Sequence, residues 1–146
     1  MQQRLSIITL GVSDLKKSKQ FYDSLGWKAA NEGEKESNEI VAYNLNGMAF
    51  ALYPIEKLGD EFSFVKPSLN SYSSMTMAYN VSSEKEVDDV INEAKSIGAE
   101  IVKMPEKVFW GGYSGYFCDP DGYLWEVAFN PFSKVKDDGS FQWGET

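Results

Sequence analysis

The segment that decides the fold lies near the C-terminal end of the chain and reads Asp119-Pro120-Asp121-Gly122-Tyr123-Leu124-Trp125-Glu126-Val127-Ala128-Phe129-Asn130-Pro131. Pro120 fixes the φ angle that the second position of a type I turn requires, and Gly122 suits the fourth position. After the turn, large apolar side chains occupy every second position, which is typical of a strand with two different faces. The segment therefore predicts a turn followed by a strand.

Glu126 is the one charged side chain within this strand. On the segment alone, a solvent-exposed position is the simpler interpretation, because an ionised glutamate is rarely buried. The role of Glu126 therefore depends on what the rest of the chain places beside it.

Length and composition indicate a compact protein with a substantial core. The 146 residues, of which 42% are hydrophobic and 14% aromatic, fit one domain or two small packed modules. No apolar run approaches the length of a membrane span, and the N-terminal apolar stretch is too short and interrupted for a secretory signal. The single cysteine, Cys118, allows no internal disulfide and no cysteine-based zinc site. We therefore expect a cytoplasmic protein with no membrane partner.

The charge excludes several classes of function. The chain has 22 acidic and 14 basic residues, and it has no cluster of Lys and Arg with aromatics that could neutralise nucleic-acid phosphates. We therefore expect no nucleic-acid partner. The glycines at 111, 112 and 115 lack the context of a phosphate-binding loop. The chain contains no histidine, so catalysis by a Ser or Cys nucleophile with a histidine base is excluded. The acidity weakly favours a neutral or cationic small ligand.

The same order of elements is predicted twice. In the first half, residues 4–12 alternate as a strand, Ser13-Asp14 offers helix-capping oxygens, and an apolar stripe at helical spacing ends at Gly26. Asn46-Gly47 is a type I′ hairpin signal between the last two strands. The three strands after the helix are expected over residues 27–31, 39–45 and 48–53.

The second half repeats this order. Residues 74–81 alternate as a strand, Ser83 and Glu86 form a capping box, and an apolar stripe ends at Gly98. The strands after this helix are expected over residues 99–103, 113–118 and 123–129.

We therefore predict an α+β fold in which two βαβββ modules form a curved mixed sheet around a central cup, with the helices on the outside. A single domain spans 1–133, with module one at about 1–55, a linker at about 56–71 and module two at about 72–133. Residues 134–146 form a polar tail, for which two alternatives remain open: Phe141 and Trp143 fold back on the body or meet a partner, or the terminus is loosely ordered.

The strand faces turned away from the helices carry mostly small or apolar residues, among them Thr9, Ala51, Thr76 and Ala78. Charged residues would dominate an open solvated surface, so this composition suits a semi-enclosed ligand pocket. Glu126 belongs to this set, and the repeat therefore changes its interpretation to a pocket residue.

Two motifs resemble the vicinal oxygen chelate superfamily, which includes glyoxalase I, extradiol dioxygenases, fosfomycin resistance enzymes and bleomycin resistance proteins. They read Leu10-Gly11-Val12-Ser13-Asp14-Leu15 through Ser18, Phe21-Tyr22 and Leu25-Gly26, and Asp119-Pro120-Asp121-Gly122 through Trp125-Glu126 and Asn130-Pro131. The resemblance covers nearly the whole chain up to about Pro131. It is specific for a fold and not for a reaction, and it implies a homodimer.

Enzymes of that superfamily hold a divalent metal with inward residues, usually His and Glu. By the resemblance, the corresponding positions here are Ile7, Ala51, Thr76 and Glu126. Ile and Ala cannot ligate, and a Thr hydroxyl is a poor ligand for a transition metal. We expect no cofactor and no glyoxalase-type metal site, and leave open a weakly held divalent ion at Glu126.

A carboxylate on a mostly apolar face is also a candidate general acid or base. The structural alternative is that Glu126 accepts hydrogen bonds from Thr9, Ser74, Thr76 or a tyrosine and ties the modules together. The aromatic segment over residues 109–117 offers a pocket rim, where Trp110 or Tyr113 stacks on a planar or cationic ligand. Its alternative role is packing between the modules.

We therefore expect a metal-free protein that binds a small organic molecule, as bleomycin resistance proteins do by sequestration. The expected ligand-binding residues are Glu126, Trp110, Tyr113, Thr76, Tyr53, Thr9 and Ser74. The alternative is a lyase or isomerase of the glyoxalase type that uses Glu126 as its general base. A third class is a subunit or regulatory module that keeps the fold without the chemistry.

Overall fold

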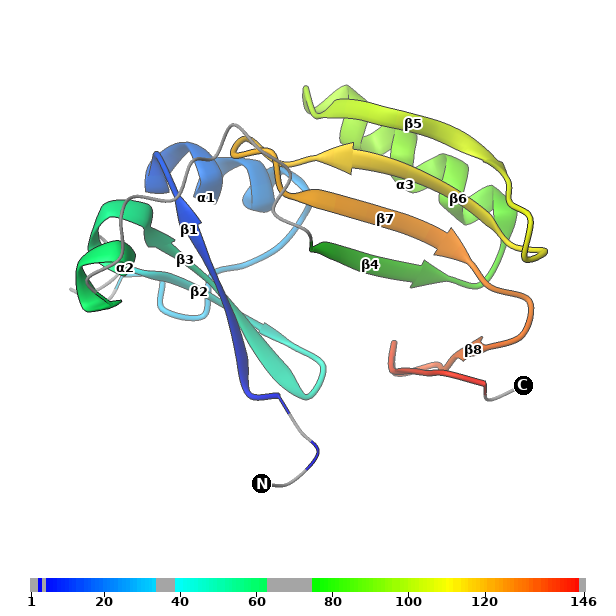
Figure 1. Ribbon diagram of the computed structural model, residues 1–146, viewed down its shortest axis with the longest axis horizontal. Helices are drawn as coiled ribbons and strands as arrows, with labels where there is room; N and C mark the ends of the chain where they lie inside the picture. Colours follow the sequence, from blue (N-terminus) through cyan, green and yellow to red (C-terminus); the bar gives the residue numbers. More distant parts are fainter. Residues whose placement is uncertain (1–2, 4, 34–38, 63–74, 145–146) are drawn as a thin grey trace. The chain divides into compact units, whose positions relative to one another are not determined.

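The computed structural model describes residues 3, 5–33, 39–62 and 75–144. The chain divides into two compact units, Met1–Ser71 and Tyr72–Thr146 (Figure 1). Each unit is α+β, with a mixed sheet of three strands in the first and of four strands in the second. Within the described residues no helix is both long and apolar enough to span a membrane.

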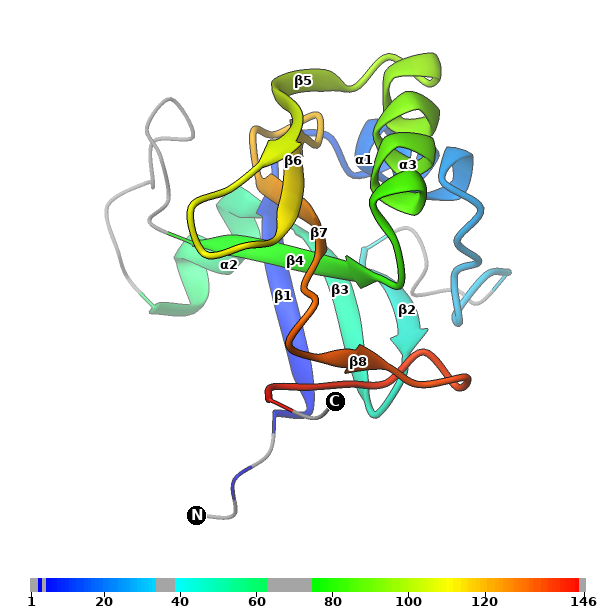
Figure 2. The same ribbon diagram turned by 90° about the vertical axis from the view of Figure 1, so that its right-hand side faces the viewer.

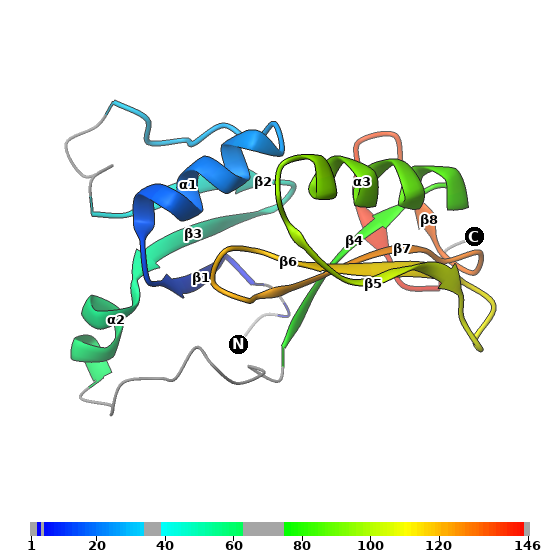
Figure 3. The ribbon, with the colours of Figure 1, turned by 90° about the horizontal axis from the view of Figure 1, so that it is seen from above.

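The first unit consists of a sheet and two helices that contact it (Figure 3). Its elements are β1 (Ile7–Val12), α1 (Leu15–Ser24), β2 (Val41–Leu45), β3 (Met48–Pro54) and α2 (Ile55–Phe62). The strand order is β1-β3-β2, with β1 parallel and β2 antiparallel to β3. Asp14 begins α1 as predicted, because its carboxylate accepts a hydrogen bond from the Lys17 amide at 3.0 Å. Tyr22, Phe50 and Leu52 form the core under α1.

The strand expected over residues 27–31 is wrong, since the described structure has no strand there. The Ala30 amide donates one hydrogen bond to the Ala42 carbonyl at 2.7 Å. Beyond it, the Asn31 side chain donates to the Ile40 carbonyl at 2.8 Å and accepts from the Ala42 amide at 3.1 Å. The Asn31 side-chain amide thus replaces backbone hydrogen bonds of a strand along β2. The alternation of side chains in the sequence does not predict such a replacement.

The segment expected as a linker begins with the helix α2. Pro54 is the last residue of β3, and the helix follows it directly. Ile55 and Leu58 lie against Gly11 so closely that a Cβ atom there would be 3.0 Å from Ile55 and 3.3 Å from Leu58. Glycine therefore allows α2 to contact β1. The remainder of the expected linker, 63–71, lies outside the described residues.

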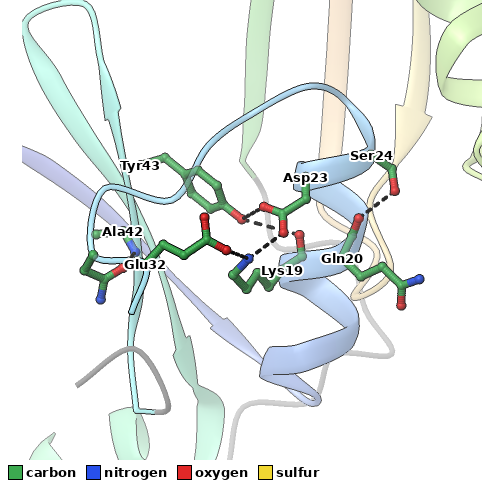
Figure 4. Close-up of polar contacts among 8 residues, drawn as sticks. Lys19, Gln20, Asp23, Ser24, Glu32, Ala42 and Tyr43 are labelled. Carbon is green, nitrogen blue, oxygen red and sulfur yellow. Dashed lines mark hydrogen bonds and ion pairs between the residues drawn. The ribbon is translucent and has the colours of Figure 1, made fainter. Parts of the chain in front are cut away.

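A polar cluster joins α1 to β2 (Figure 4). The Tyr43 hydroxyl, on a side chain only 1% exposed, donates to the Asp23 carboxylate at 3.2 Å. Lys19 forms ion pairs with Asp23 and Glu32. Burial raises the pKa of Tyr43, and the neighbouring Asp23 charge raises it further.

The second unit contains the complete βαβββ order. Its first elements are β4 (Thr76–Val81), α3 (Glu84–Ser96), β5 (Glu100–Lys107), β6 (Tyr113–Cys118) and β7 (Leu124–Phe129). The strand order is β4-β7-β6-β5, with β4 parallel to β7 and the other pairs antiparallel. The predicted cap of α3 is present, because Ser83 Oγ accepts from the Glu86 amide at 3.2 Å. Val87, Ile91 and Ala94 of α3 are buried against the sheet.

The turn before β7 is the one that the sequence predicts. Gly122 has a φ of 85°, and its amide donates to the Asp119 carbonyl at 3.0 Å. The side chain of Asp119 is buried and adds to the turn, since its Oδ1 accepts from the amides of Asp121 at 3.0 Å and Tyr123 at 2.9 Å.

After β7 the chain forms a small hairpin, which we call the C-terminal hairpin, residues 133–144. Its strands are β8 (Lys134–Val135) and β9 (Phe141–Gln142), which pair antiparallel. Figures 1 and 2 show β8 on the β4 side of the sheet. Of the alternatives for the tail, the described structure has an ordered hairpin.

Candidate functional site

The face of the second sheet that is turned away from α3 carries the candidate site. Trp125 and Val127 of β7 are 8% and 0% exposed on the helical face, so Glu126 between them points to the other face. The strand register sets Glu126 beside Ala78 of β4 and Tyr116 of β6. Asn80 lies one pair further along, beside Ala128.

A groove of about 460 Å³ lies over this face, within the roughly 300–1,000 Å³ that is usual for small-molecule sites. Small side chains from β4 and β7 form its base, three aromatic side chains stand around it, and four polar side chains reach into it. The lining residues are Ala78, Asn80, Trp110, Glu126, Ala128, Asn130, Phe132, Ser133, Trp143 and Gly144. All of them belong to the second unit.

Glu126 is half-buried in this groove. Among the described residues of the second unit, no side chain forms a hydrogen bond or ion pair with its carboxylate. The same holds for the side-chain amide of Asn80. Of the residues that the structure describes, no lysine or arginine lines the groove. Within the described part of this unit, both groups thus have hydrogen-bonding capacity for a bound molecule.

Trp110 is brought to the groove by a tight loop between β5 and β6. The Gly111 amide donates to the Val108 carbonyl at 2.9 Å, and the Val108 amide donates to the Gly112 carbonyl at 3.0 Å. The indole lies so close over Gly112 that a Cβ atom there would be 1.9 Å from the ring and 2.8 Å from the Phe129 carbonyl oxygen. Gly112 is therefore required for this position of Trp110.

Asn130 and Ser133 connect the end of β7 to the C-terminal hairpin. Asn130 Oδ1 accepts from the Phe132 amide at 2.9 Å, and Asn130 Nδ2 donates to Ser133 Oγ at 3.4 Å. Ser133 Oγ also accepts from the Gly144 amide at 3.0 Å. These bonds hold both ends of the hairpin at one end of the groove.

Of the residues expected in the site, the structure brings Glu126 and Trp110 together. Thr76 lies on the same face as Glu126 but pairs with Leu124 and does not line the groove. Thr9 and Tyr53 belong to the corresponding face of the first unit, where they pair with Ala51 and Gly11. Ser74 lies outside the described residues.

Tyr113, which was expected among the ligand-binding residues, does not line this groove. It pairs with Phe129 on the helical face of the sheet, and its hydroxyl donates to Asp88 of α3 at 2.9 Å. That hydrogen bond raises the pKa of Tyr113. Because side chains alternate along β6, the aromatic residues of this segment do not all lie on one face of the sheet.

The sequence did not predict the following lining residues as part of the site: Asn80, Asn130, Phe132, Ser133, Trp143 and Gly144. Two signals pointed towards them. Asn130 is part of the motif that carries the family resemblance, and Trp143 is one of the two aromatics in the polar tail.

The positions at which the superfamily implies a metal do not fit a divalent ion. In the first unit Ile7 pairs with Ala49, and Ala51 pairs with Thr9, so neither position offers a metal ligand. In the second unit one hydroxyl and one carboxylate, at Thr76 and Glu126, are available. The described residues hold no group of three or more potential metal-binding side chains.

Comparison with known proteins identifies related chains. The family model described as Glyoxalase/Bleomycin resistance protein/Dioxygenase superfamily matches residues 4–127. A glyoxalase-related enzyme from Fulvimarina pelagi is 31% identical, with 98% of this chain and 99% of that chain covered and a TM-score of 0.86. A hypothetical protein from S. aureus is 25% identical, with coverage of 89% and 95% and a TM-score of 0.73.

A more distant structure shares the fold. A variant of the genomically encoded fosfomycin resistance protein from Listeria monocytogenes, in complex with Mn(II) and 1S,2S-dihydroxypropylphosphonic acid, is 24% identical. The match covers 87% of this chain and 90% of that chain, with a TM-score of 0.64.

Proposed function

Because the chain belongs to the Glyoxalase/Bleomycin resistance protein/Dioxygenase superfamily, we propose that it binds a small organic molecule in the groove around Glu126 and holds it without chemical change. The superfamily includes binding proteins and metal enzymes, so membership alone does not give the function. The function has to be inferred from the residues of this groove. The poor donor set at the metal positions supports binding without a metal. The proposed partner is a small molecule, and neither nucleic acid nor a membrane. We further propose that the protein is a cytoplasmic homodimer.

The observation that carries the proposal is the half-buried Glu126 carboxylate. No described side chain of the second unit forms a hydrogen bond or ion pair with it. A partly buried charge without a partner is unfavourable, so a ligand that donates hydrogen bonds or brings a positive charge gains affinity there. The aromatic walls supply apolar contact for the remainder of the ligand.

The test is a binding screen with metal-free bleomycin and a panel of cationic aromatic drugs, read out by thermal shift and then by calorimetry. We expect at least one ligand, with affinity reduced on the order of tenfold or more in Glu126→Gln, since a charge-assisted hydrogen bond contributes about 1.5–3 kcal/mol. Glu93→Gln is the matched control, because Glu93 is exposed on α3 and changes the net charge equally. Equal affinity of Glu126→Gln and Glu93→Gln for every ligand found would contradict the role of Glu126.

A second candidate function is a glyoxalase-type lyase or isomerase, which the same carboxylate favours as general base. Asn80 beside it offers an amide donor to a developing oxyanion. The test is turnover of the methylglyoxal–glutathione hemithioacetal in the presence of a chelator. Turnover that Glu126→Gln abolishes and Glu93→Gln retains would favour this enzyme over the binding protein.

A further inference from the structure

The C-terminal hairpin supplies part of the groove although it lies beyond the matched family region. The family match ends at residue 127. Phe132, Ser133, Trp143 and Gly144 nevertheless line the groove. This part of the wall is thus added to the strands that the family model covers.

The hairpin is fixed at both ends and at its turn. Ser133 Oγ holds the Gly144 amide at 3.0 Å, which places Trp143 beside the residue that begins the hairpin. At the turn, the Gly139 amide donates to the Lys136 carbonyl at 2.8 Å, and the Lys136 amide donates to the Ser140 carbonyl at 3.0 Å. The position of Trp143 therefore follows from a hydrogen-bonded element.

The aromatic side chains at the groove have large exposed surfaces. Trp143 is 85% exposed, Phe132 59% and Trp110 37%. A ligand that covers these rings removes apolar surface from water, which favours binding. The hairpin contributes Trp143, the most exposed of the three rings, and Phe132 directly precedes the hairpin.

The polar groups of the groove select the charge of that ligand. Glu126 accepts hydrogen bonds, and Asn80 both accepts and donates them. Since no lysine or arginine is among the described lining residues, an anionic ligand would meet Glu126 with no compensating charge from that lining. A flat cation, in contrast, satisfies the carboxylate and is attracted to aromatic faces.

We propose that the C-terminal hairpin determines the specificity of the groove and that it selects planar aromatic cations with N–H donors, such as aryl amidines. The ring contacts Trp143, and the amidinium donates to the Glu126 carboxylate in a two-point hydrogen bond. Asn80 accepts a further N–H. This inference rests on the proposed function, because it assigns a ligand class and a specificity-determining residue to the same groove.

The experiment uses the full chain and two matched probes, the bis-amidine DAPI and its uncharged parent phenylindole. Binding is followed by probe fluorescence for the wild type, Trp143→Ala, Trp143→Phe and Phe109→Ala. Phe109→Ala is the control, since Phe109 is 101% exposed and does not line the groove.

We expect the wild type to bind DAPI and to prefer it over phenylindole by on the order of tenfold or more. Trp143→Ala should lower DAPI affinity by a similar factor, Trp143→Phe should retain most of it, and Phe109→Ala should leave it unchanged. Ser133→Ala, which removes the acceptor for the Gly144 amide, should weaken DAPI binding as well.

Two outcomes would overturn this inference while the proposed function stands. In the first, ligands lose affinity with Glu126→Gln but bind Trp143→Ala as tightly as the wild type. In the second, phenylindole binds as well as DAPI, or DAPI does not bind while another small molecule does. Failure of every small molecule in the earlier screen is the separate outcome that removes the proposed function itself. Unchanged thermal midpoints of the Trp143 variants establish that they are folded.

Discussion

At the scale of single residues, the candidate site depends on a glycine that leaves space as well as on the side chains that line the groove. Gly112 provides the space in which the Trp110 ring lies. A side chain at position 112 would displace the indole from the groove, because closely packed atoms accommodate an added atom only when their neighbours shift.

Gly112→Ala tests this dependence. The added Cβ would overlap the Trp110 ring and approach the Phe129 carbonyl oxygen, so we expect a loss of about 1–3 kcal/mol in the free energy of unfolding. Ligand affinity should fall together with stability. Urea denaturation measures the first and calorimetry the second. The double variant Trp110→Ala/Gly112→Ala should recover part of the stability, and a stable, fully binding single variant would contradict the interpretation.

Tyr43 gives a prediction on alkaline stability. Its pKa is raised from 10.0, chiefly by burial and then by Asp23, so the neutral hydroxyl is the form that the folded state favours. The resulting stabilisation is complete below pH 10 and is lost as pH rises towards the folded pKa. Urea denaturation of the wild type should therefore show falling stability above about pH 10.

Tyr43→Phe removes the titrating group. We expect it to lose about 1 kcal/mol at neutral pH with the hydrogen bond to Asp23, and to show a shallower decline above pH 10 than the wild type. Tyr79→Phe serves as the control, because Tyr79 is 50% exposed. A parallel alkaline decline in Tyr43→Phe and the wild type would assign the effect to other groups.

At the scale of elements, the sequence correctly predicts helix starts and strands that depend on local residue patterns. It fails where one side chain replaces the backbone pairing that such a pattern implies. Both main helices begin at the predicted caps, and β6 coincides with residues 113–118. The strand over 27–31 fails because the Asn31 amide replaces backbone pairing. Helix α2 (Ile55–Phe62) lies almost wholly in the segment expected as a linker, although Ile55 and Leu58 stand at helical spacing.

The site follows the same division. Alternation in the opening segment correctly separates Glu126 from Trp125 and Val127. It cannot predict the groove wall from the tail, because that wall depends on the Ser133 and Asn130 side chains bonding across a loop. Such contacts have no period along the chain.

The C-terminal hairpin gives a prediction for acid conditions. The Asp138 carboxylate accepts from Ser140 Oγ at 2.7 Å and from the Ser140 amide at 2.9 Å, and these bonds lower the pKa of Asp138 below 3.8. The stabilisation is therefore present above that value and is lost as pH falls through the lowered pKa. The Ser140 amide resonance, followed by NMR, should titrate with a midpoint below 3.8.

Two variants examine this assignment. Ser140→Ala removes the hydroxyl donor and should move the midpoint upwards, towards the ordinary aspartate value. Asp138→Asn should abolish the acid step at residue 140. An unaltered step in Asp138→Asn would show that another group titrates.

At the scale of the whole molecule, the family and the chemistry diverge. The chain matches the superfamily over residues 4–127, yet three of the four positions at which the family implies a metal carry Ile7, Ala51 and Thr76. Membership therefore describes how the chain folds, and the groove of the second unit describes what we propose it binds.

Metal analysis of protein purified without a chelator tests this division. We expect less than stoichiometric Zn, Ni, Mn and Fe, since a single carboxylate leaves an ion mostly hydrated and weakly held. A chelator should accordingly leave both the thermal midpoint and ligand affinity unchanged. A tightly bound, stoichiometric metal, or loss of binding on chelation, would contradict the metal-free proposal.

The attachment of the C-terminal hairpin has a consequence for changing the groove by substitution. Its side chains reach the groove, but the β4-β7-β6-β5 sheet is paired without it. We therefore expect substitutions between residues 133 and 144 to change the proposed ligand preference at small cost to the hydrogen bonding of that sheet. The groove wall can thus be altered separately from the scaffold that carries Glu126.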